Sequence, residues 1–449
     1  MKLKLIENLL KITTILLMST FTENSLATSR HVFVCRTSLL PKLNSALARE
    51  LEAIKANFCG TVYIEENSDY PLPSEDDHGV LFLCGDIGAQ IVKTKQAVSV
   101  IKELSCNYSE SGHSDYVLIS IDEVPINVHG LGVYYKQLFF EECERNLFNE
   151  IKNSHDFQDL TESNKQGKAY RTGIYLTNVE KCSDGLSFNL LRCSTNLSGP
   201  TDNFRDVDRS VVDRVECEAN SVFTMPVHLN HVLAQIYHNS LIETTTDTHV
   251  QSRSEKKAVI KAHSDKTKDM PKSGIIAFTT FYDNIDKYGT GAGAGTRRRE
   301  SSDDLFNVCY KGISVLTSLH FRLKSSVTDP AFVKQFTITL YPNSVFLISL
   351  LTNRLYTHEI RASVLPVDKI PTRLGYVIRC SSTKAVFRDG THIDQGDGTL
   401  APMHFITPEE TSALKELYFK ENTSIDVINY DSRNMLFSMN SGDYKMPIL

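Results

Sequence analysis

The sequence predicts an α+β protein, with a small α/β region near the N-terminus and a larger, mainly antiparallel β region after it. Two observations support this fold class. Between residues 30 and about 130, strand-like and helix-like runs alternate, which is typical of a sheet with crossover helices. From about residue 130, short strand-like runs follow one another without intervening helices, which is typical of a sandwich or barrel.

The composition is that of a globular protein. The chain has 449 residues, of which 41% are hydrophobic and 23% charged, so a disordered or fibrous protein is excluded. A formal net charge of −6 excludes a strongly basic chain that binds nucleic acid by charge alone, although it permits a local basic groove. Ten cysteines in this length, without a CxxC pair, support neither a disulfide-built scaffold nor a zinc knuckle.

The first residues have the three-part pattern of a secretory signal. Basic residues precede an apolar stretch, Ile12–Phe21, and Ser25-Leu26-Ala27 has the small-x-small form of a cleavage site. Residues 1–27 are therefore a candidate signal peptide; the alternative is a disordered or frayed N-terminus of a cytoplasmic or nuclear protein. No run of 18 apolar residues occurs, so we expect no stable membrane insertion.

Residues 30–130 form the expected small α/β domain. Helices are expected at 40–57 and 87–104, from the spacing of their apolar residues. The expected strands are His31–Cys35, Thr61–Ile64, Val80–Leu83 and Tyr116–Ile121.

Residues 131–449 form the second expected domain. Its first element is an amphipathic helix at 139–151. Two polar stretches, 244–257 and 288–304, are expected to be loops, because neither has an apolar face. The expected strands are 173–179, 187–192, 275–281, 336–340, 345–350 and 376–380.

The residues that carry chemistry form a possible iron site. Non-haem Fe(II) oxygenases hold the metal with two histidines and one carboxylate, and leave the other coordination positions open. A His-x-Asp pair suits this arrangement, because alternate residues at the end of a strand point to the same side. With 14 histidines about one such pair arises by chance, and the chain contains three, so context must decide among them.

The pair His263/Asp265 has the most favourable context. It precedes the strand expected at 275–281, and His358 follows the strand expected at 345–350. Arg373 comes fifteen residues after His358, and Arg379 six residues later, so both arginines fall on one face of a strand. A guanidinium there could hold a carboxylate in a bidentate fork.

The other two pairs are interpreted as structural or surface residues. His113/Asp115 is followed by His155, which falls at the end of a predicted helix, where a helix-dipole or capping role is ordinary. His392/Asp394 lies in a Gly- and Asp-rich segment without a suitably spaced histidine and arginine after it.

Taken together, these motifs resemble the Fe(II)/2-oxoglutarate-dependent dioxygenases of the AlkB type. The resemblance covers about residues 230–380 and rests on the order of its motifs. They are Leu-Ala-Gln-Ile-Tyr at 233–237, His-Ser-Asp-Lys at 263–266, His358, and Arg-Leu-Gly-Tyr-Val-Ile-Arg at 373–379. It implies a double-stranded β-helix (jelly-roll) dioxygenase domain, with His263, Asp265 and His358 as the Fe(II) ligands.

The resemblance also implies a co-substrate pocket. Arg373 would bind the distal carboxylate of 2-oxoglutarate, Tyr237 would hydrogen-bond the co-substrate, and Arg379 would support the pocket. O₂ would be the second co-substrate. Two residues depart from the family pattern, since Gln235 and Gly375 stand where the family has asparagine. These departures put nucleobase repair in doubt.

Three functions remain open at this point. The first is hydroxylation or oxidative demethylation of an alkylated nucleic acid base, for which 253–268 and Arg297–Arg299 offer basic segments. The second is hydroxylation of a protein or small molecule, which a secretory signal would favour. The third is a non-catalytic jelly-roll binding protein that keeps the fold without iron.

Overall fold

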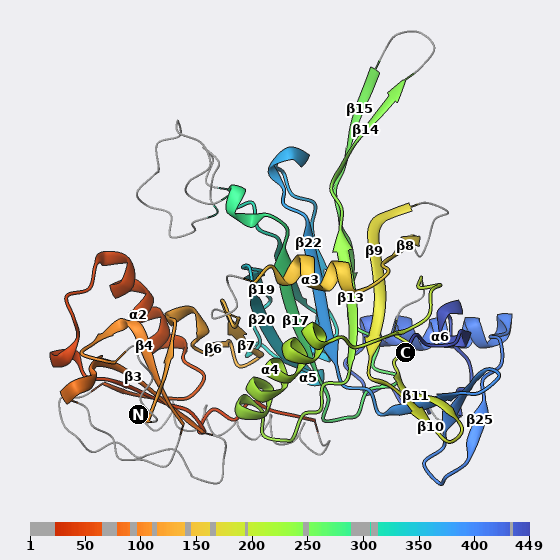
Figure 1. Ribbon diagram of the computed structural model, residues 1–449, viewed down its shortest axis with the longest axis horizontal. Coiled ribbons are helices and arrows are strands. Elements are labelled where there is room, and N and C mark those ends of the chain that lie inside the picture. Colours follow the sequence, from red (N-terminus) through yellow and green to blue (C-terminus); the bar gives the residue numbers. More distant parts are fainter. Residues whose placement is uncertain are drawn as a thin grey trace.

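The computed structural model describes residues 23–64, 79–89, 97–109, 115–139, 145–161, 168–193, 196–245, 251–288, 306, 313–431 and 434–449. Most of the candidate signal peptide, His113 and the segment containing Arg297–Arg299 lie outside the described residues. The described part is a mixed α/β structure, with a parallel sheet near the N-terminus and predominantly antiparallel sheets after it (Figure 1).

The N-terminal sheet has five parallel strands in the order β2-β1-β3-β4-β5. Helix α2 (Ser45–Asn57) begins at Asn44, whose side chain accepts from two backbone N–H groups of the first turn. It packs Leu51 and Ile54 into the core on one face of the sheet. The strands are β1 (Val32–Cys35), β2 (Thr61–Ile64), β3 (Val80–Asp86), β4 (Ala97–Cys106) and β5 (Val117–Ile119).

The prediction of a helix at 87–104 is wrong. A short 3₁₀ turn, η2 (Ile87–Ala89), is followed after an undescribed segment by strand β4. The apolar residues of this stretch fit a helical spacing and a buried strand equally well. The β-branched residues Val98, Val100 and Ile101 favour the strand, because their side chains pack well on a pleated surface.

A nine-stranded sheet forms the centre of the remaining chain, in the order β12-β9-β13-β22-β17-β20-β7-β6 with β8 added on β9. Its pairs are antiparallel except for β12 with β9. The strands are β6 (Ile126–Val128), β7 (Gly132–Tyr135), β8 (Gln158–Thr161), β9 (Lys168–Thr177), β12 (Asp202–Asn203), β13 (His231–Tyr237), β17 (Ile275–Tyr282), β20 (Ser344–Ser349) and β22 (Arg373–Arg379).

A four-stranded antiparallel sheet packs against one face of the nine-stranded sheet, in the order β16-β21-β18-β19. Aromatic rings fill the space between the sheets: Phe346 meets Phe321 edge-on at 5.6 Å, and Phe321 stacks on Phe336 at 4.7 Å. The two sheets therefore form a sandwich with an apolar interior. The strands are β16 (Ile260–His263), β18 (Ser318–Leu323), β19 (Gln335–Thr339) and β21 (Tyr356–Ile360).

Helices cover the opposite face of the nine-stranded sheet (Figure 1). Helix α3 (Leu147–Ser154) begins eight residues later than the helix expected at 139–151. Helix α4 (Asp206–Val222), which the sequence analysis did not expect, buries Val211, Val215 and Ala219 on the sheet. These residues recur every four positions, which places them on one side of the helix.

A second five-stranded sheet and a helix complete the C-terminal part. The sheet has the order β10-β11-β23-β24-β25, and His392/Asp394 lie on β24 rather than in a loop. The elements are β10 (Val179–Cys182), β11 (Gly185–Leu190), β23 (Thr383–Phe387), β24 (Thr391–Asp394), β25 (Leu400–Pro402), α5 (Leu350–Leu355) and α6 (Pro408–Thr423).

Within the described part of the chain, none of the helices has the length and hydropathy needed to cross a bilayer.

The polar stretch expected to be a loop at 244–257 is a β-hairpin. Strands β14 (Ser240–Thr245) and β15 (Gln251–Lys256) pair with each other and project from the body of the molecule (Figure 1). Leu241 is exposed there. Of the hairpin residues whose burial is described, 240–242 and 254–256, none is buried. The sequence of the two strands likewise shows no alternation of apolar and polar residues that could identify them.

A buried charged cluster joins α3 and α4 to the nine-stranded sheet. His155 follows α3, and its ring lies 2.7 Å from Asp202 and 2.8 Å from Asp208. Tyr376 of β22 donates to the other oxygen of Asp208 at 2.7 Å. Burial alone would lower the pKa of His155, but the hydrogen bonds to Asp202 and Asp208 outweigh it and raise the pKa to about 9. His155 is therefore charged at neutral pH and has a structural role.

The His155 cluster makes stability depend on pH. Because the folded pKa lies above the unfolded value of about 6.5, the stabilisation is complete below pH 6.5 and declines as pH rises towards 9. The difference in unfolding free energy between wild type and His155→Gln should shrink by roughly 3 kcal/mol across this window. Urea unfolding at several pH values measures it, and a constant difference would contradict a charged His155.

Candidate metal centre

Three potential ligands meet at the edge of the four-stranded sheet. His263 ends β16, and His358 lies directly opposite it on β21. Their rings are 4.4 Å apart between centroids. Asp265 follows two residues after His263, and one donor atom from each of the three side chains lies within 4.8 Å of the others. Among the described residues, this is the only group of three or more potential ligands with such spacing.

The two carboxylate oxygens of Asp265 face different partners. Oδ1 lies 3.5 Å from Nε2 of His263 and 3.6 Å from Nε2 of His358. Oδ2 accepts two hydrogen bonds from the Arg379 guanidinium, at 2.6 and 3.0 Å. Burial would raise the pKa of Asp265, but Arg379 and the two histidines hold it well below the usual value. The carboxylate is therefore ionised, with one oxygen directed at the imidazoles.

Both histidines can present a lone pair to a metal. His263 Nδ1 lies 2.9 Å from the Lys261 carbonyl oxygen, a bond that only a protonated Nδ1 can make, so in the neutral ring Nε2 keeps its lone pair. His358 packs edge-on against Phe278 at 5.2 Å, and burial lowers its pKa to about 3, which keeps it neutral. The His358 side chain is 5% exposed and that of His263 is 35% exposed, so the group is open on the His263 side.

The residues thus fit a ferrous ion by the chemistry of their donors. Two imidazoles and one carboxylate oxygen are the donor set that non-haem Fe(II) uses, and one open side leaves room for further ligands. Arg379 supplies the hydrogen bonds that orient the carboxylate, as outer partners of metal ligands commonly do.

Arg373 and Tyr237 lie on the inner face of the nine-stranded sheet. They are direct neighbours on β22 and β13, and the Arg373 guanidinium lies 4.1 Å from the centre of the Tyr237 ring. A Cβ atom added to Gly375 would lie 3.0 Å from Nη1 of Arg373. The guanidinium therefore leans along β22 over Gly375, in the direction of Arg379. Nη2 of Arg373 is buried without a hydrogen-bond partner among the described residues.

A cavity of about 220 Å³ adjoins this arginine. It is lined by 313–318, 360–364 and 370–371, together with Tyr237, Asn239, Ala258, His320 and Arg373. The three potential metal ligands are not among its lining residues. An orphaned guanidinium nitrogen at a cavity fits a carboxylate ligand, because a buried cation without a partner is costly.

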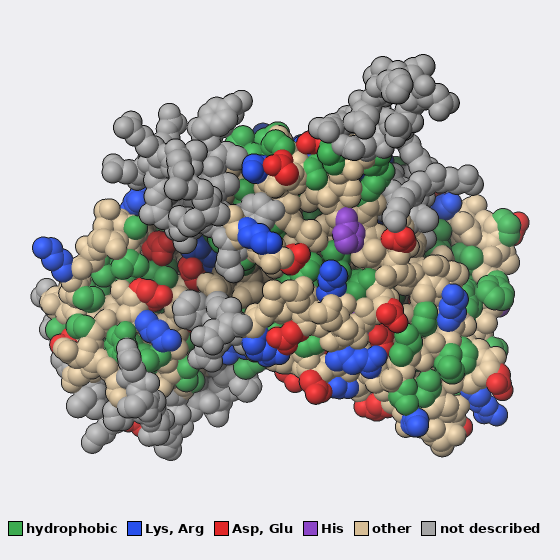
Figure 2. All heavy atoms as spheres, turned by 45° about the horizontal axis from the view of Figure 1, so that its top comes forward, with side chains coloured by type: hydrophobic (Ala, Val, Ile, Leu, Met, Phe, Trp, Pro, Cys, Tyr) green, Lys and Arg blue, Asp and Glu red, His purple; other side chains and the backbone are tan. Residues whose placement is uncertain are grey.

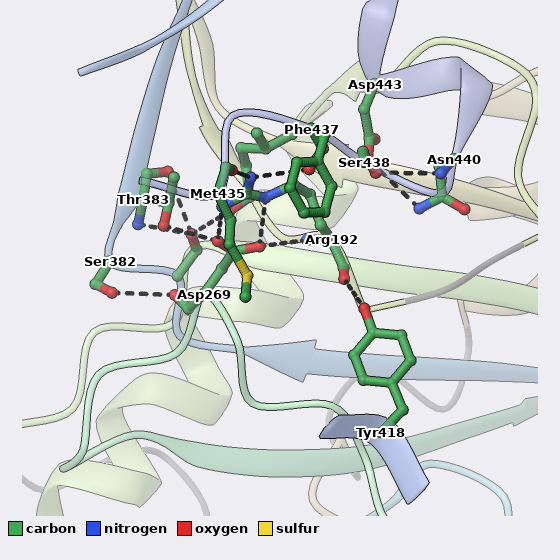
Figure 3. Close-up of polar contacts among 12 residues, drawn as sticks. Arg192, Asp269, Ser382, Thr383, Tyr418, Met435, Phe437, Ser438, Asn440 and Asp443 are labelled. Atoms are coloured by element: carbon green, nitrogen blue, oxygen red, sulfur yellow. Dashed lines mark hydrogen bonds and ion pairs between the residues drawn. The ribbon is translucent and has the colours of Figure 1, made fainter. Parts of the chain in front are cut away.

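The sequence analysis missed the residues that hold the chain after Asp265. The Arg192 guanidinium makes a buried pair with Asp269, with Nη2 2.6 Å from Oδ1, and also donates to the carbonyls of Met435 and Phe437 (Figure 3). Thr383 donates to Asp269 at 2.9 Å. Arg192 was expected as the end of the strand at 187–192, and no local pattern marks a partner 77 residues away.

The remaining candidate residues do not join the group. His155 lies in the buried cluster on the other face of the nine-stranded sheet. His392 Nδ1 lies 3.0 Å from the Gly390 carbonyl, and Asp394 accepts from the backbone of Gly396, so both serve their own turns.

Comparisons with known proteins give weak similarities only. No family model and no curated protein matches the chain. Among solved structures, the chain is similar to the structure of OsALKBH1, with a TM-score of 0.29 and 13% identity over 56% of this chain and 96% of that one. It is also similar to the selenomethionine-labelled Fe(II)/α-ketoglutarate-dependent dioxygenase TqaL, with a TM-score of 0.22 and 10% identity over 57% and 78%. At these values the site must be interpreted from its own geometry.

The geometry predicts metal-dependent stability. Mn(II), a redox-inert substitute for Fe(II), should raise the melting temperature of the wild-type protein, because an ion that binds only the folded state stabilises it. His263→Ala and Asp265→Ala should lose this increment. His392→Ala is the matched control from another His-x-Asp pair and should keep it. Equal increments in all four proteins, measured by differential scanning fluorimetry, would exclude these residues as ligands.

Proposed function

We propose that the chain is an Fe(II)- and 2-oxoglutarate-dependent dioxygenase with a double-stranded β-helix core, and that it hydroxylates or oxidatively demethylates its substrate. One observation carries the proposal: two histidines from paired strands and an ionised aspartate place their ligand atoms within 4.8 Å of one another. Two histidines and a carboxylate are the ligands of the facial triad in non-haem Fe(II) oxygenases. The position of Arg373 on the same sheet as Arg379, with its guanidinium leaning towards that end, supports a dicarboxylate co-substrate.

Each residue of the candidate site would have a distinct role in the proposed reaction. His263, Asp265 and His358 would hold Fe(II), which with 2-oxoglutarate and O₂ supplies the oxidising chemistry for C–H bonds. Arg373 would bind the distal carboxylate of the co-substrate in a bidentate manner. Arg379 helps to keep Asp265 ionised and donates to its Oδ2, so Oδ1 would be the oxygen available to the metal.

Tyr237 and the sandwich core would orient the co-substrate and exclude water. The Tyr237 hydroxyl donates to Gln235 at 2.9 Å, which fixes the ring on which Arg373 stacks. The ring of Phe278 closes the inner side of His358. A dry, prearranged pocket positions the reactants and strengthens the electrostatic interactions inside it.

The proposed substrates include an alkylated nucleic acid base, as the motif order of the AlkB type implies. Figure 2 shows acidic and basic side chains interspersed on the face presented there, without a continuous basic surface among the described residues. The formal net charge of −6 favours a nucleoside, a short single strand or a small molecule over a long duplex, which requires many phosphate contacts. A panel of methylated nucleosides, methylated oligonucleotides and peptides, assayed for product by mass spectrometry, distinguishes these classes.

The central test is turnover of 2-oxoglutarate to succinate in the presence of Fe(II). Wild type should form succinate, and His263→Ala should reduce the rate by at least a hundredfold. Arg373→Ala should raise the KM for 2-oxoglutarate at least tenfold, because it removes a charge-assisted bidentate contact of about 1.5–3 kcal/mol. Arg322→Ala, an exposed arginine on β18, is the control. Turnover that is absent from the wild type, or unaffected by both site changes, would exclude the proposed activity.

Gly375 offers a separate test of the co-substrate pocket. An added Cβ would lie 3.0 Å from Arg373 Nη1 and 3.1 Å from the Tyr237 ring, so Gly375→Ala should displace the guanidinium by a few tenths of an ångström. We expect a several-fold higher Kd for 2-oxoglutarate, measured by equilibrium dialysis with the Mn(II)-loaded protein. Mn(II) affinity should stay unchanged, because the metal ligands lie elsewhere. An unchanged Kd would show that Arg373 does not contact the co-substrate.

A further inference from the structure

The short loop that carries Asp265 leaves the strand ladder directly after His263. Its backbone N–H groups therefore need other partners, because unpaired buried N–H groups are costly. Two asparagine side chains supply them. The N–H of Ser264 donates to Oδ1 of Asn422 at 2.8 Å, and the N–H of Asp265 donates to Oδ1 of Asn353 at 2.8 Å.

Asn353 holds Asp265 at two points. Its Nδ2 also donates to the carbonyl oxygen of Asp265 at 2.9 Å, so one carboxamide pairs with both backbone groups of the same residue. Asn353 is 1% exposed and belongs to α5, five residues before His358. One short segment thus connects the loop of one potential ligand to the strand of another.

Asn422 connects the same loop to the C-terminal helix. It lies in the last turn of α6, beside Glu421, which accepts from the N–H and the hydroxyl of Thr267 at 3.0 and 2.5 Å. The Ser264 hydroxyl donates to the Tyr356 carbonyl on β21 at 3.1 Å. Successive residues of the loop are therefore held by three elements, β21, α5 and α6.

The geometry points to Asn353 and Asn422 as positioning residues of the candidate metal centre, an inference that rests on the proposed function. Neither side chain belongs to the potential ligand set. Asn353 fixes the peptide groups on both sides of the Asp265 Cα, and Asn422 fixes the preceding peptide group, between His263 and Ser264. Together they set the direction in which the Asp265 carboxylate meets the two imidazoles. Partners that orient ligands in this way commonly contribute 10- to 100-fold to metal affinity. Docking of α6 is then a condition for tight metal binding.

The test is the Mn(II) affinity of the full chain, measured from the EPR signal of the free ion. Asn422→Ala removes the acceptor for Ser264 and should weaken Mn(II) binding about tenfold. Asn422→Asp keeps an acceptor oxygen and should restore most of the affinity. Asn353→Asp loses the donor to the Asp265 carbonyl and should weaken binding and broaden the spectrum of the bound ion.

Asn220→Ala is the matched control. Asn220 makes three side-chain hydrogen bonds within and beside α4, so its loss affects stability without touching the loop. Its Mn(II) affinity should equal that of the wild type. Circular dichroism establishes that each variant is folded, and the Asn353→Asp result decides the case if Asn422→Ala does not fold. Folded variants with wild-type affinity would overturn the inference. A wild-type protein that binds no Mn(II) would instead refute the metal centre itself.

Discussion

The carboxylate of Asp265 is the constraint on which the rest of the site depends. It is buried and ionised, and a buried charge is tolerated only when it is paired and hydrogen-bonded. Arg379, on the nine-stranded sheet, donates hydrogen bonds to one carboxylate oxygen, and the other oxygen faces two imidazoles of the four-stranded sheet. A divalent cation between the carboxylate and the two imidazoles would satisfy all three groups at once.

The sandwich brings these groups together because each sheet supplies a different part. The four-stranded sheet places His263 opposite His358 through strand register, which fixes their separation without a special loop. The nine-stranded sheet places two arginines six residues apart on one face of β22. Gly375 lies between them and leaves room for the guanidinium of Arg373. The two sheets meet over aromatic and aliphatic side chains, so the polar groups lie at the edge of an apolar core.

Much of this arrangement could be predicted from the sequence because it depends on local periodicity. Alternation along 373–379 placed both arginines on one face, and the apolar run at 275–281 is the buried strand β17. Strand β4 was mistaken for a helix because a short apolar run fits both periods. Helix α4 was missed because valines dominate its buried face, and valine favours strands in isolation.

The supporting residues could not be predicted because their partners are distant in sequence. Asn353 bonds Asp265 across 88 positions, and Asn422 bonds Ser264 across 158. Asparagine at the end of a helix is ordinary capping chemistry, so neither residue differs locally from many others. Their role follows only from tertiary contacts, which the His-x-Asp motif does not predict.

The most direct test of this account is the position of a bound metal. Crystals of the protein grown with Mn(II) and 2-oxoglutarate would be measured at the manganese absorption edge. The account predicts one anomalous peak within bonding distance of Nε2 of His263, Nε2 of His358 and one oxygen of Asp265, with the co-substrate extending from it to Arg373. A peak bound by other residues, or no peak while the three side chains keep their present positions, would contradict it.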